Sequence, residues 1–422
     1  MNDVYDLLGI GVGPFNLSLA ALVQPIANCK TIFFEQNKDF NWHPDLMLDF
    51  SSLQTPFMSD LVTLADPCSE FSYLNYAKKT GNLYSFYIKE DFFLKRAEYN
   101  AYCQWVVSRL NNLAFTSKVE AAVYLPTEKC YQVNVQTPTG DSFFYAKNLV
   151  VGVGTKPIIP DFCPKSPNIM HSGKYLSYKD KLLNCSNILI IGSGQSAAEV
   201  FYDLLLASEH YAYKLTWCTR SPRFFPLEYT KLTLELTSPD YIDYFYSLPE
   251  AKRVALVKTQ SSLYKGINSS LINDIYDLLY DKKQAGKAAK VELRTNMQAT
   301  EINVLPETIN VDFLQTELNQ TCTIPAEFVI LGTGYQNYFP SCLTPIKDSL
   351  NLDANNMIKL HRNYSADNNN SVFMQNLGLH THGLTAPDLG MSCYRNSVIL
   401  NAILGYEPYK IETKIAFQDF NL

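Results

Sequence analysis

The sequence predicts an α/β protein built from two Rossmann-like dinucleotide-binding domains with an inserted, mainly helical region. Two stretches carry this prediction, because residues 4–23 and 187–207 each read as a short apolar run, a glycine-rich turn and an apolar helix. A short apolar run that ends at glycines is typical of a strand buried in a parallel sheet. The inserted region is residues 225–290, which are rich in tyrosine and helical in pattern.

The first glycine-rich turn has the residues that a dinucleotide needs. Gly11 permits the tight turn, and Gly13 lets the backbone approach a pyrophosphate at the N-terminus of the helix that begins near Pro14. Asn16 stands in place of the usual third glycine, so the pattern does not by itself predict close packing of helix and strand at that position. Glu35 ends the next strand, at the distance of an acid that binds ribose hydroxyls. An ordinary glycine-rich turn is the alternative, but the complete pattern favours a bound dinucleotide.

A polar and aromatic loop, residues 39–60, follows this second strand. Loops at the carboxyl ends of strands line the ligand crevice of an open α/β sheet. Trp42, His43 and Gln54 are therefore candidates to face the cofactor. The alternatives are that Trp42 packs in the core and that His43 is a loop residue with satisfied hydrogen bonds and no catalytic role.

The next elements follow from periodicity and turn residues. Residues 69–110 are expected to be mainly helical, with the aromatic segment 84–93 between helices. Residues 115–150 alternate apolar and polar side chains around a Pro-Thr-Gly-Asp turn, which predicts a small antiparallel meander. The glycines and prolines that follow, up to residue 160, mark a crossing between domains.

The second dinucleotide-binding pattern differs from the first at the end of its second strand, where the first has an acid. The next strand, residues 215–220, ends in Arg220 instead of an acid, and Arg223 lies close behind. A 2′-phosphate needs a cation there, so this site is predicted to bind NADPH and not NADH. A surface cap on the strand is the alternative for Arg220. The predicted NADPH contacts are Gly192, Gly194, Gln195, Ser196, Arg220 and Arg223.

The remaining residues complete this organisation. Short strands are expected at 291–325, a further glycine-ended strand at 328–335, a surface excursion at 350–370, a loop at 378–391 and a closing helix at 392–404. We expect residues 1–160 and 326–422 to form an FAD-binding domain. Residues 161–325 are expected to form the NADPH-binding domain, whose 225–290 insertion contributes to the substrate pocket. Two such motifs in one chain are the arrangement of two-dinucleotide flavoproteins.

Composition limits the possible partners and location. The net charge of −6 argues against a nucleic-acid surface. The ten cysteines form no C-x-x-C pair, which is the pattern of reduced thiols in a cytoplasmic protein and not of a disulfide framework or a metal site. The apolar stretch 7–23 holds glycines, a proline and an asparagine and belongs to a βα unit, so no membrane span is expected.

Several stretches together resemble one enzyme family. They are Gly-Val-Gly-Pro-Phe-Asn-Leu (11–17), Trp-His-Pro (42–44), Gln-Thr (54–55), Asp-Leu-Val (60–62), 72–76, Arg-x-Glu-Tyr (96–99), Gly-Ser-Gly-Gln-Ser-Ala-Ala-Glu (192–199), Gly-Thr-Gly-Tyr (332–335) and Thr-His-Gly-Leu (381–384). In this order they resemble the flavin-dependent N-hydroxylating monooxygenases of siderophore biosynthesis, and other stretches look most like the putrescine and cadaverine hydroxylases.

The resemblance implies a bound FAD, NADPH as reductant, O2 as co-substrate and a primary amine as target. The oxygen is delivered from a C4a-hydroperoxyflavin, so no side chain is assigned a catalytic role and no metal is expected. The resemblance also suggests a homo-oligomer. The residues assigned to FAD are Gly11, Gly13, Pro14, Asn16, Glu35, Trp42, His43, Gln54, Gly334, Leu389 and Met391.

The substrate positions depart from those of the amino-acid hydroxylases. Ser59 stands where those enzymes place a Lys that holds the substrate carboxylate, Gly390 stands in place of a Ser, and Leu234 in place of an Asn. Asn268 is also assigned to the substrate. Asp388 is an acid that could hold a second ammonium, unless it only forms a turn after proline. A short aliphatic diamine is therefore expected, putrescine first and cadaverine second.

Other functions remain open at this point. They are L-lysine or L-ornithine N-hydroxylation, a flavin monooxygenase that acts on sulfur or a ketone, an NADPH-dependent flavoprotein reductase, and an inactive dinucleotide-binding regulator. Amine-stimulated NADPH oxidation with formation of a hydroxylamine separates N-hydroxylation from the last three, and product analysis with a panel of amines identifies the substrate.

Overall fold

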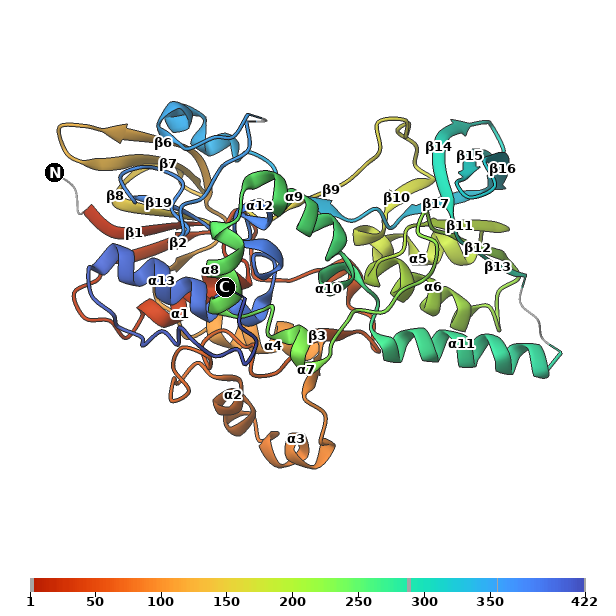
Figure 1. The fold of residues 1–422 in the computed structure, drawn as a ribbon, viewed down its shortest axis with the longest axis horizontal. Coiled ribbons are helices and arrows are strands. Elements are labelled where there is room, and N and C mark those ends of the chain that lie inside the picture. Colours follow the sequence, from red (N-terminus) through yellow and green to blue (C-terminus); the bar gives the residue numbers. More distant parts are fainter. Residues whose placement is uncertain (1–3, 287–289, 355, 421–422) are drawn as a thin grey trace.

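The structure is a computed structural model that describes residues 4–286, 290–354 and 356–420. Figure 1 shows two regions side by side, each with its own sheet, joined by extended segments and by helices that lie between them. The end of the expected insertion, residues 287–289, lies outside the described residues. The predicted α/β class with two dinucleotide-binding units is confirmed by the sheets described below.

The first sheet has the strand order β5–β2–β1–β8–β7–β6, and β19 also pairs with β8. Strand β1 lies parallel to β2 and β8, whereas β6, β7 and β8 form the predicted antiparallel meander. Helix α1 is buried along almost its whole length, because it lies against α4 and the closing helix α13. The strands are β1 (Val4–Ile10), β2 (Thr31–Phe34), β5 (Leu113–Ala114), β6 (Lys118–Leu125), β7 (Cys130–Thr137), β8 (Gly140–Val151) and β19 (Val372–Met374).

The second sheet is parallel throughout, with the order β10–β17–β11–β12–β13. Strands β11 and β17 are apolar runs whose side chains are almost all buried, as expected for the centre of a parallel sheet. The strands are β10 (Ile169–His171), β11 (Asn187–Ile191), β12 (Lys214–Cys218), β13 (Val291–Arg294) and β17 (Phe328–Leu331). A separate antiparallel sheet contains β14 (Met297–Val304), β15 (Ile309–Gln315) and β16 (Gln320–Ala326).

The chain crosses between the two main sheets twice, and the crossing segments pair with each other. Strand β9 (Lys156–Pro157) leaves the first sheet, and β18 (Tyr335–Gln336) returns from the second, in antiparallel register with Tyr335 opposite Pro157. Strand β17 lies in the second sheet, although residues from 326 on were expected with the first. The second sheet therefore includes residues as far along the chain as Leu331. The division into two domains remains our proposal.

Helices cover both sheets and fill the space between them (Figure 1). Helix α13 matches the predicted closing helix 392–404. The helices are α1 (Pro14–Val23), α2 (Tyr73–Lys79), α3 (Leu83–Lys89), α4 (Arg96–Val107), α5 (Tyr175–Leu183), α6 (Gln195–Ala207), α7 (Lys231–Leu234), α8 (Pro239–Ser247), α9 (Glu250–Thr259), α10 (Ser262–Lys265), α11 (Ser269–Gln284), α12 (Leu379–His382) and α13 (Ser392–Leu404). Short 3-10 turns lie at Pro44–Leu46, Ser172–Lys174, Ser341–Ser349, Gly383–Thr385 and Leu389–Met391.

Three segments differ from the sequence-based expectation. Residues 378–391, expected to be a loop, contain helix α12 and the 3-10 turns Gly383–Thr385 and Leu389–Met391. The aromatic segment 84–93 contains helix α3 and the start of strand β4 (Phe93–Lys95), which pairs with β3 (Ser52–Pro56). The expected surface excursion at 350–370 includes buried Tyr364, Ser365 and Asp367.

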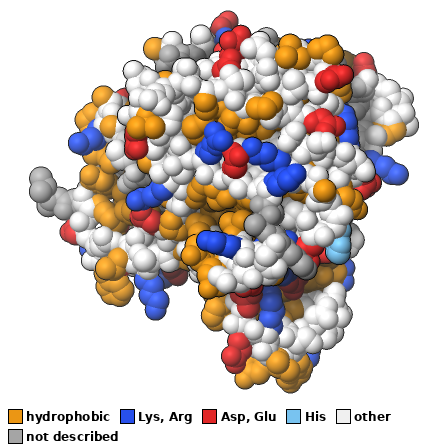
Figure 2. Space-filling model, turned by 90° about the vertical axis from the view of Figure 1, so that its right-hand side faces the viewer, with side chains coloured by type: hydrophobic (Ala, Val, Ile, Leu, Met, Phe, Trp, Pro, Cys, Tyr) orange, Lys and Arg blue, Asp and Glu red, His pale blue; other side chains and the backbone are white. Residues whose placement is uncertain are grey.

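The surface carries charges of both signs. On the face that Figure 2 shows, Lys and Arg side chains are interspersed with Asp, Glu and hydrophobic ones. Within residues 4–286, 290–354 and 356–420, no helix combines the length and apolar character that a bilayer crossing needs. The same residues contain no group of three or more His, Cys, Asp or Glu side chains placed to hold a metal ion.

Candidate active site

The first glycine turn leaves an open cradle at the N-terminus of α1. Gly11 has φ +84°, and a Cβ there would lie 2.6 Å from the Gly152 carbonyl oxygen, so this position requires glycine. A Cβ on Gly13 would meet nothing within 4 Å. Gly13 is also the N-cap of α1, where Pro14 occupies the first turn and no side chain caps the free backbone N–H groups. The turn thus presents backbone donors to open space, as a pyrophosphate requires.

Asn16 takes over the structural role of the third glycine. Its Nδ2 donates to the carbonyl oxygens of Gly11 (2.8 Å), Ile10 (3.3 Å) and Val150 (3.3 Å). A Cβ on Gly152 would lie 2.7 Å from the same nitrogen, so β8 passes close to α1. The side chain therefore ties α1 to the ends of β1 and β8 by hydrogen bonds where a glycine would do so by contact.

Glu35 braces the same turn from the end of β2. Its Oε2 accepts a hydrogen bond from the Val12 N–H at 2.8 Å, and its Oε1 accepts from the backbone and side-chain nitrogens of Asn37 at 2.9 and 2.7 Å. The carboxylate is thus fixed beside the glycine turn, where a ribose hydroxyl could donate to its remaining lone pairs.

The second glycine turn repeats this geometry at α6. Gly192 has φ +143°, and a Cβ there would lie 2.1 Å from the Gly332 carbonyl oxygen, whereas a Cβ on Gly194 would have only the Lys265 carbonyl at 4.0 Å. Gly194 is the N-cap of α6, and Gln195 and Ser196 form its first turn. In both turns the first glycine is required by close packing and the second faces open space.

Arg220 and Arg223 lie exposed just beyond the end of β12, the strand that follows α6 in the sequence. Lys265, at the end of α10, is a third cation near Arg220 that no pattern in the sequence indicated. Desolvation, and then the charge of Arg220, lower the pKa of Lys265. A phosphate would relieve this repulsion between like charges.

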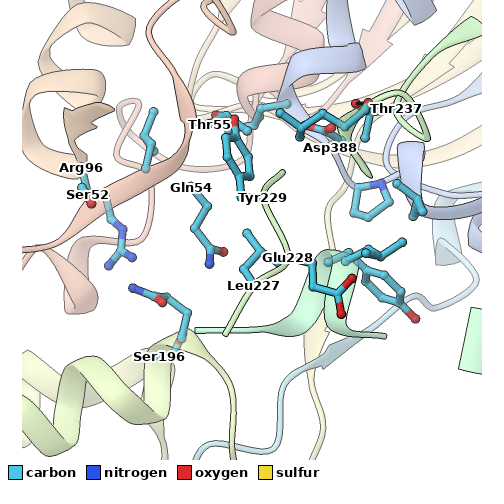
Figure 3. Close-up of a pocket in the computed structure, with 18 of the residues that line it drawn as sticks. Ser52, Gln54, Thr55, Arg96, Ser196, Leu227, Glu228, Tyr229, Thr237 and Asp388 are labelled. Atoms are coloured by element: carbon cyan, nitrogen blue, oxygen red, sulfur yellow. Dashed lines mark hydrogen bonds between the residues drawn. The ribbon is translucent and has the colours of Figure 1, made fainter. Parts of the chain in front are cut away.

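A cavity of about 290 Å³ lies between the two main sheets and the helical insertion (Figure 3). Arg96 and Ser196 lie on one side of it in this view, and Asp388 and Thr237 on the other. Strands, loops and helices from the whole length of the chain meet here. The lining residues are Trp42, His43, Leu46, Ser52, Leu53, Gln54, Thr55, Arg96, Gln195, Ser196, Leu227, Glu228, Tyr229, Thr233, Leu234, Thr237, Leu263, Tyr264, Tyr335, Leu384, Pro387, Asp388 and Leu389.

A chain of hydrogen bonds runs along this cavity wall from strand β3, past the start of α11, to helices α6 and α4. Gln54 Nε2 donates to Asn268 Oδ1 at 3.0 Å, and the Asn268 N–H donates to Gln195 Oε1 at 2.8 Å. Gln195 Nε2 in turn donates to Glu199 Oε1 at 3.0 Å, and Arg96 Nη2 lies 2.8 and 3.0 Å from the two Glu199 oxygens. Asn268 therefore positions Gln54 and Gln195 at the cavity.

Three of the expected substrate residues lie close together. Asp388 lines the cavity, and Ser59 and Gly390, which do not line it, lie beside Asp388. A Cβ on Gly390 would lie 3.2 Å from Ser59 Oγ and 3.3 Å from Asp388 Oδ1. Asp388 Oδ1 accepts the Gly390 N–H at 2.8 Å. The carboxylate therefore also stabilises a turn after Pro387, which was the alternative role expected for this residue. Burial raises the pKa of Asp388, against the Gly390 hydrogen bond and the charge of Arg395. Leu234 also lines the cavity.

Four of the residues assigned to the flavin line the same cavity: Trp42, His43, Gln54 and Leu389. The Trp42 ring packs against His43 and, edge-on, against Tyr99. His43 has left-handed backbone geometry with φ 53°. Desolvation, and then the charge of Arg96, lowers the pKa of His43 to about 4, so this imidazole is neutral at pH 7.

Gly334 and Met391 do not line the cavity, but each is close in sequence to a residue that does, Tyr335 and Leu389. Gly334 has φ +82° with nothing within 4 Å of a Cβ, and its carbonyl accepts the Ile158 N–H at 2.9 Å. Met391 is buried at the start of α13. Gly154 resembles Gly334, since it has φ +75° and open space at its Cβ.

The Thr-His-Gly stretch has a structural role. His382 is fully buried and stacks on Tyr364 with ring centroids 4.3 Å apart. Its Nε2 donates to the Arg362 carbonyl at 3.2 Å, and its Nδ1 lies 2.9 Å from the Thr381 hydroxyl. Desolvation lowers the pKa of His382 to about 3, so this side chain stays neutral and does not reach the cavity lining.

Several residues at the cavity or next to it were not assigned to the site from the sequence. Glu199, which does not itself line the cavity, carried a signal, because it lies four residues after Gln195 and so shares a face of α6 with it. Its partner Arg96 and the cavity residue Thr55 were noted as parts of motifs, and the buried Thr55 hydroxyl has no hydrogen-bond partner in the described part of the chain. Glu228 and Tyr229 had no pattern that distinguished them.

Known proteins resemble this chain over its whole length. A putrescine N-hydroxylase of Shewanella oneidensis is 52% identical over 420 residues, which are 99% of this chain and 84% of that protein. A putrescine N-hydroxylase of Acinetobacter baumannii is 45% identical over 418 residues, 99% of this chain and 94% of that protein.

The structural comparison agrees. The FAD-bound crystal structure of DfoA, the cadaverine monooxygenase of the desferrioxamine pathway of Erwinia amylovora, superposes with a TM-score of 0.98 at 48% identity, covering 100% of this chain and 99% of that one. The profile of the family described as L-lysine 6-monooxygenase/L-ornithine 5-monooxygenase matches residues 3–337. The resemblance expected from the motifs is thereby confirmed, and the chain belongs to the L-lysine 6-monooxygenase/L-ornithine 5-monooxygenase family.

Proposed function

We propose that this protein hydroxylates a primary amine nitrogen of a short aliphatic diamine, putrescine first and cadaverine second, with FAD, NADPH and O2. The product would serve hydroxamate siderophore biosynthesis. The similar cadaverine monooxygenase belongs to the desferrioxamine biosynthetic pathway. The observation that carries the choice of substrate is Asp388, an acid at the end of the cavity beside Ser59 and Gly390.

The two cofactors fit the two glycine turns. Gly13 and Gly194 each leave open space before uncapped backbone donors, which suits the pyrophosphates of FAD and NADPH. Glu35 is placed to accept from the FAD ribose, and Arg220 and Arg223 to bind the 2′-phosphate of NADPH. The bound flavin supplies reduction by NADPH and activation of O2.

The cavity residues orient the amine and keep water away. Gln54 and Gln195 are held by Asn268 and present amides to the reacting region. A diamine that enters this cavity has two nitrogens with different roles. Asp388 would hold the distal ammonium, while the proximal nitrogen must be neutral to react.

An amino-acid substrate is disfavoured by the same residues. Its carboxylate would need a cation or several donors in place of water. Ser59 supplies no charge, and Gly390 supplies no hydroxyl. A carboxylate near Asp388 would also be repelled.

The wider setting of the enzyme is part of the proposal. All ten cysteines are free thiols, which supports a reducing compartment such as the cytoplasm. Helix α3 projects from the body in Figure 1, has no buried residue, and leaves Tyr84, Tyr87 and Ile88 72–76% exposed. These exposed side chains support contact with a second copy, and hence a homo-oligomer.

Product analysis tests the proposed function. The purified enzyme would be incubated with FAD, NADPH and each of putrescine, cadaverine, histamine, lysine and ornithine, and hydroxylamine products would be identified by mass spectrometry. We expect putrescine to give the largest kcat/KM, followed by cadaverine. A preference for lysine or ornithine would reject the diamine assignment, and NADPH oxidation without any hydroxylamine would reject N-hydroxylation.

A further inference from the structure

The C-terminal segment forms what we call the strap, residues 415–420, which crosses from the first sheet's helices to the helical insertion. After α13 the chain passes α1, where the Tyr409 hydroxyl donates to the Leu22 carbonyl at 2.6 Å. It then reaches α8, where Asp240 Oδ2 accepts the backbone N–H groups of Ile415 (3.0 Å) and Ala416 (3.4 Å). Figure 1 places the end of the chain beside α8.

Glu235 binds the strap most extensively. Its two carboxylate oxygens accept the N–H groups of Phe417 and Gln418, each at 3.0 Å, and Oε2 also accepts Gln418 Nε2 at 3.0 Å. These hydrogen bonds, that of Phe417 first, lower the pKa of Glu235. Gln418 Nε2 donates as well to the Leu232 carbonyl at 2.6 Å. The strap is therefore bonded to both the middle and the end of α7.

The two phenylalanines of the strap differ in how far they are packed against the rest of the protein. Phe420 packs on the rings of Tyr241 and Tyr244, at centroid distances of 5.2 and 6.1 Å, and joins the core of the insertion around Phe245. Phe417 is 97% exposed. Only Phe420 can anchor the strap by apolar contact, so the chain provides its own matched control.

What the strap holds is a wall of the substrate cavity. Helix α7 is short and has no buried residue, so it has little core of its own to fix it. Yet Thr233 and Leu234 of α7 line the cavity, as does Thr237 just beyond it. The residue between them in contact with the strap is Glu235.

We propose that Glu235 and Phe420 are positioning residues, which act through the strap to hold α7 against the cavity and so set its fit to the carbon chain of the amine. The proposal rests on amine hydroxylation as the function. It places a determinant of substrate binding in the last described residues of the chain, outside the cavity itself.

The experiment compares Glu235→Gln and Phe420→Ala with Phe417→Ala in the full-length enzyme loaded with FAD. Steady-state kinetics would give KM and kcat for putrescine, and the ratio of hydroxylamine formed to NADPH consumed would give the coupling. We expect the first two variants to raise KM roughly threefold to tenfold and to lower coupling, since charge-assisted bonds and one ring contact are lost. Phe417→Ala should match the wild type.

Anaerobic flavin reduction by NADPH supplies the readout that separates positioning from general loss of structure. Its rate and the melting temperature should stay close to wild type in every variant, and Phe420→Leu should restore KM because it keeps apolar contact with Tyr241. The proposal is wrong if Phe420→Ala and Glu235→Gln leave KM and coupling unchanged, or if they slow flavin reduction as much as hydroxylation.

The outcome also distinguishes this inference from the proposed substrate. If the wild type hydroxylates another amine in preference to putrescine, the same comparison is made with that amine. A KM effect confined to the Glu235 and Phe420 variants would then support the strap while the diamine assignment fails.

Discussion

Arg96 and Glu199 form a buried ion pair that joins α4 of the first region to α6 of the second, with Arg96 Nη2 at 2.8 and 3.0 Å from the two carboxylate oxygens. Glu199 is fully buried and Arg96 nearly so. Burial raises the pKa of Glu199, and the Arg96 charge opposes this rise. Arg96 also donates to the Leu46 carbonyl, so its guanidinium is bound on two sides.

Breaking this pair should destabilise the protein. Glu199→Gln leaves a buried guanidinium without its counter-charge, and the free energy of unfolding should fall by about 3 kcal/mol. Denaturant unfolding followed by circular dichroism would measure the loss. The double variant Arg96→Met, Glu199→Leu removes both charges and should recover most of it. Equal stability of Glu199→Gln and wild type would mean that the pair contributes little.

Gly13→Val should abolish FAD retention without disturbing the fold. The new side chain meets no protein atom within 4 Å of its Cβ, so it would occupy the space that we assign to the pyrophosphate. The flavin absorbance of the purified variant and its circular dichroism spectrum check both halves of this statement. Gly194→Val places the same side chain at the N-cap of α6, where the backbone has a similar φ of −91°, and should leave FAD retention intact. Full flavin occupancy in Gly13→Val would move the FAD site elsewhere.

Arg220→Ala should weaken the use of NADPH but not that of NADH. A charge-assisted contact to the 2′-phosphate contributes about 1.5–3 kcal/mol, so KM for NADPH should rise roughly tenfold or more. NADH lacks this phosphate and serves as the internal control in the same variant. If both cofactors respond equally, Arg220 has a structural role, and if neither responds, Arg223 or Lys265 binds the phosphate.

Asp388→Asn should impair the use of putrescine while flavin reduction by NADPH continues. Loss of one partner of a buried charged pair costs about 2–5 kcal/mol, which corresponds to at least roughly a thirty-fold fall in kcat/KM. Glu228→Gln removes the other acid that lines the cavity and is the matched control. A larger loss in Glu228→Gln would make Glu228 the ammonium anchor, and normal hydroxylation by Asp388→Asn would leave Asp388 as a turn residue.

The free energy of unfolding should decrease as the pH is lowered below 6.5, in part because of His382. Its pKa is lowered from 6.5 to about 3 by burial, so below pH 6.5 the unfolded chain binds a proton that the folded protein refuses. This contribution is complete above pH 6.5 and is lost as the pH falls toward 3, by about 1.4 kcal/mol at about pH 5.5. Unfolding midpoints between neutral pH and pH 5.5 should therefore drop more steeply in wild type than in His382→Gln. Parallel curves would contradict the assignment of a neutral His382.

The two βα units could be predicted because their signals are local. A strand, a glycine turn and a helix are contiguous at residues 4–23, and each step is imposed by residues a few positions apart. The sheet that contains strand β17 could not be predicted, because a short, fully buried apolar run reads the same in either sheet. Residues 378–391 were expected to be a loop because helices of three or four residues have no detectable period.

The cavity depends on contacts that no local pattern encodes. Arg96 and Glu199 are separated by 103 residues, and either could have been a surface charge. Polar composition also misled the expectation for residues 350–370, since Asp367 is buried and uses its carboxylate to bind the N–H groups of Ser371 and Val372. Such a segment reads as exposed because its hydrogen-bond partners cannot be seen from composition.

The double crossing between the sheets has a consequence for biosynthesis of the chain. Strands β10 to β17, residues 169–331, complete the second sheet, whereas the first sheet begins at residue 4 but waits for β19 and α13, residues 372–404. During translation the region synthesised second can therefore finish its sheet while the region synthesised first still lacks strand β19 and a covering helix. The order of completion is the reverse of the order of synthesis, and the N-terminal glycine turn gains its full support only when the last helix leaves the ribosome.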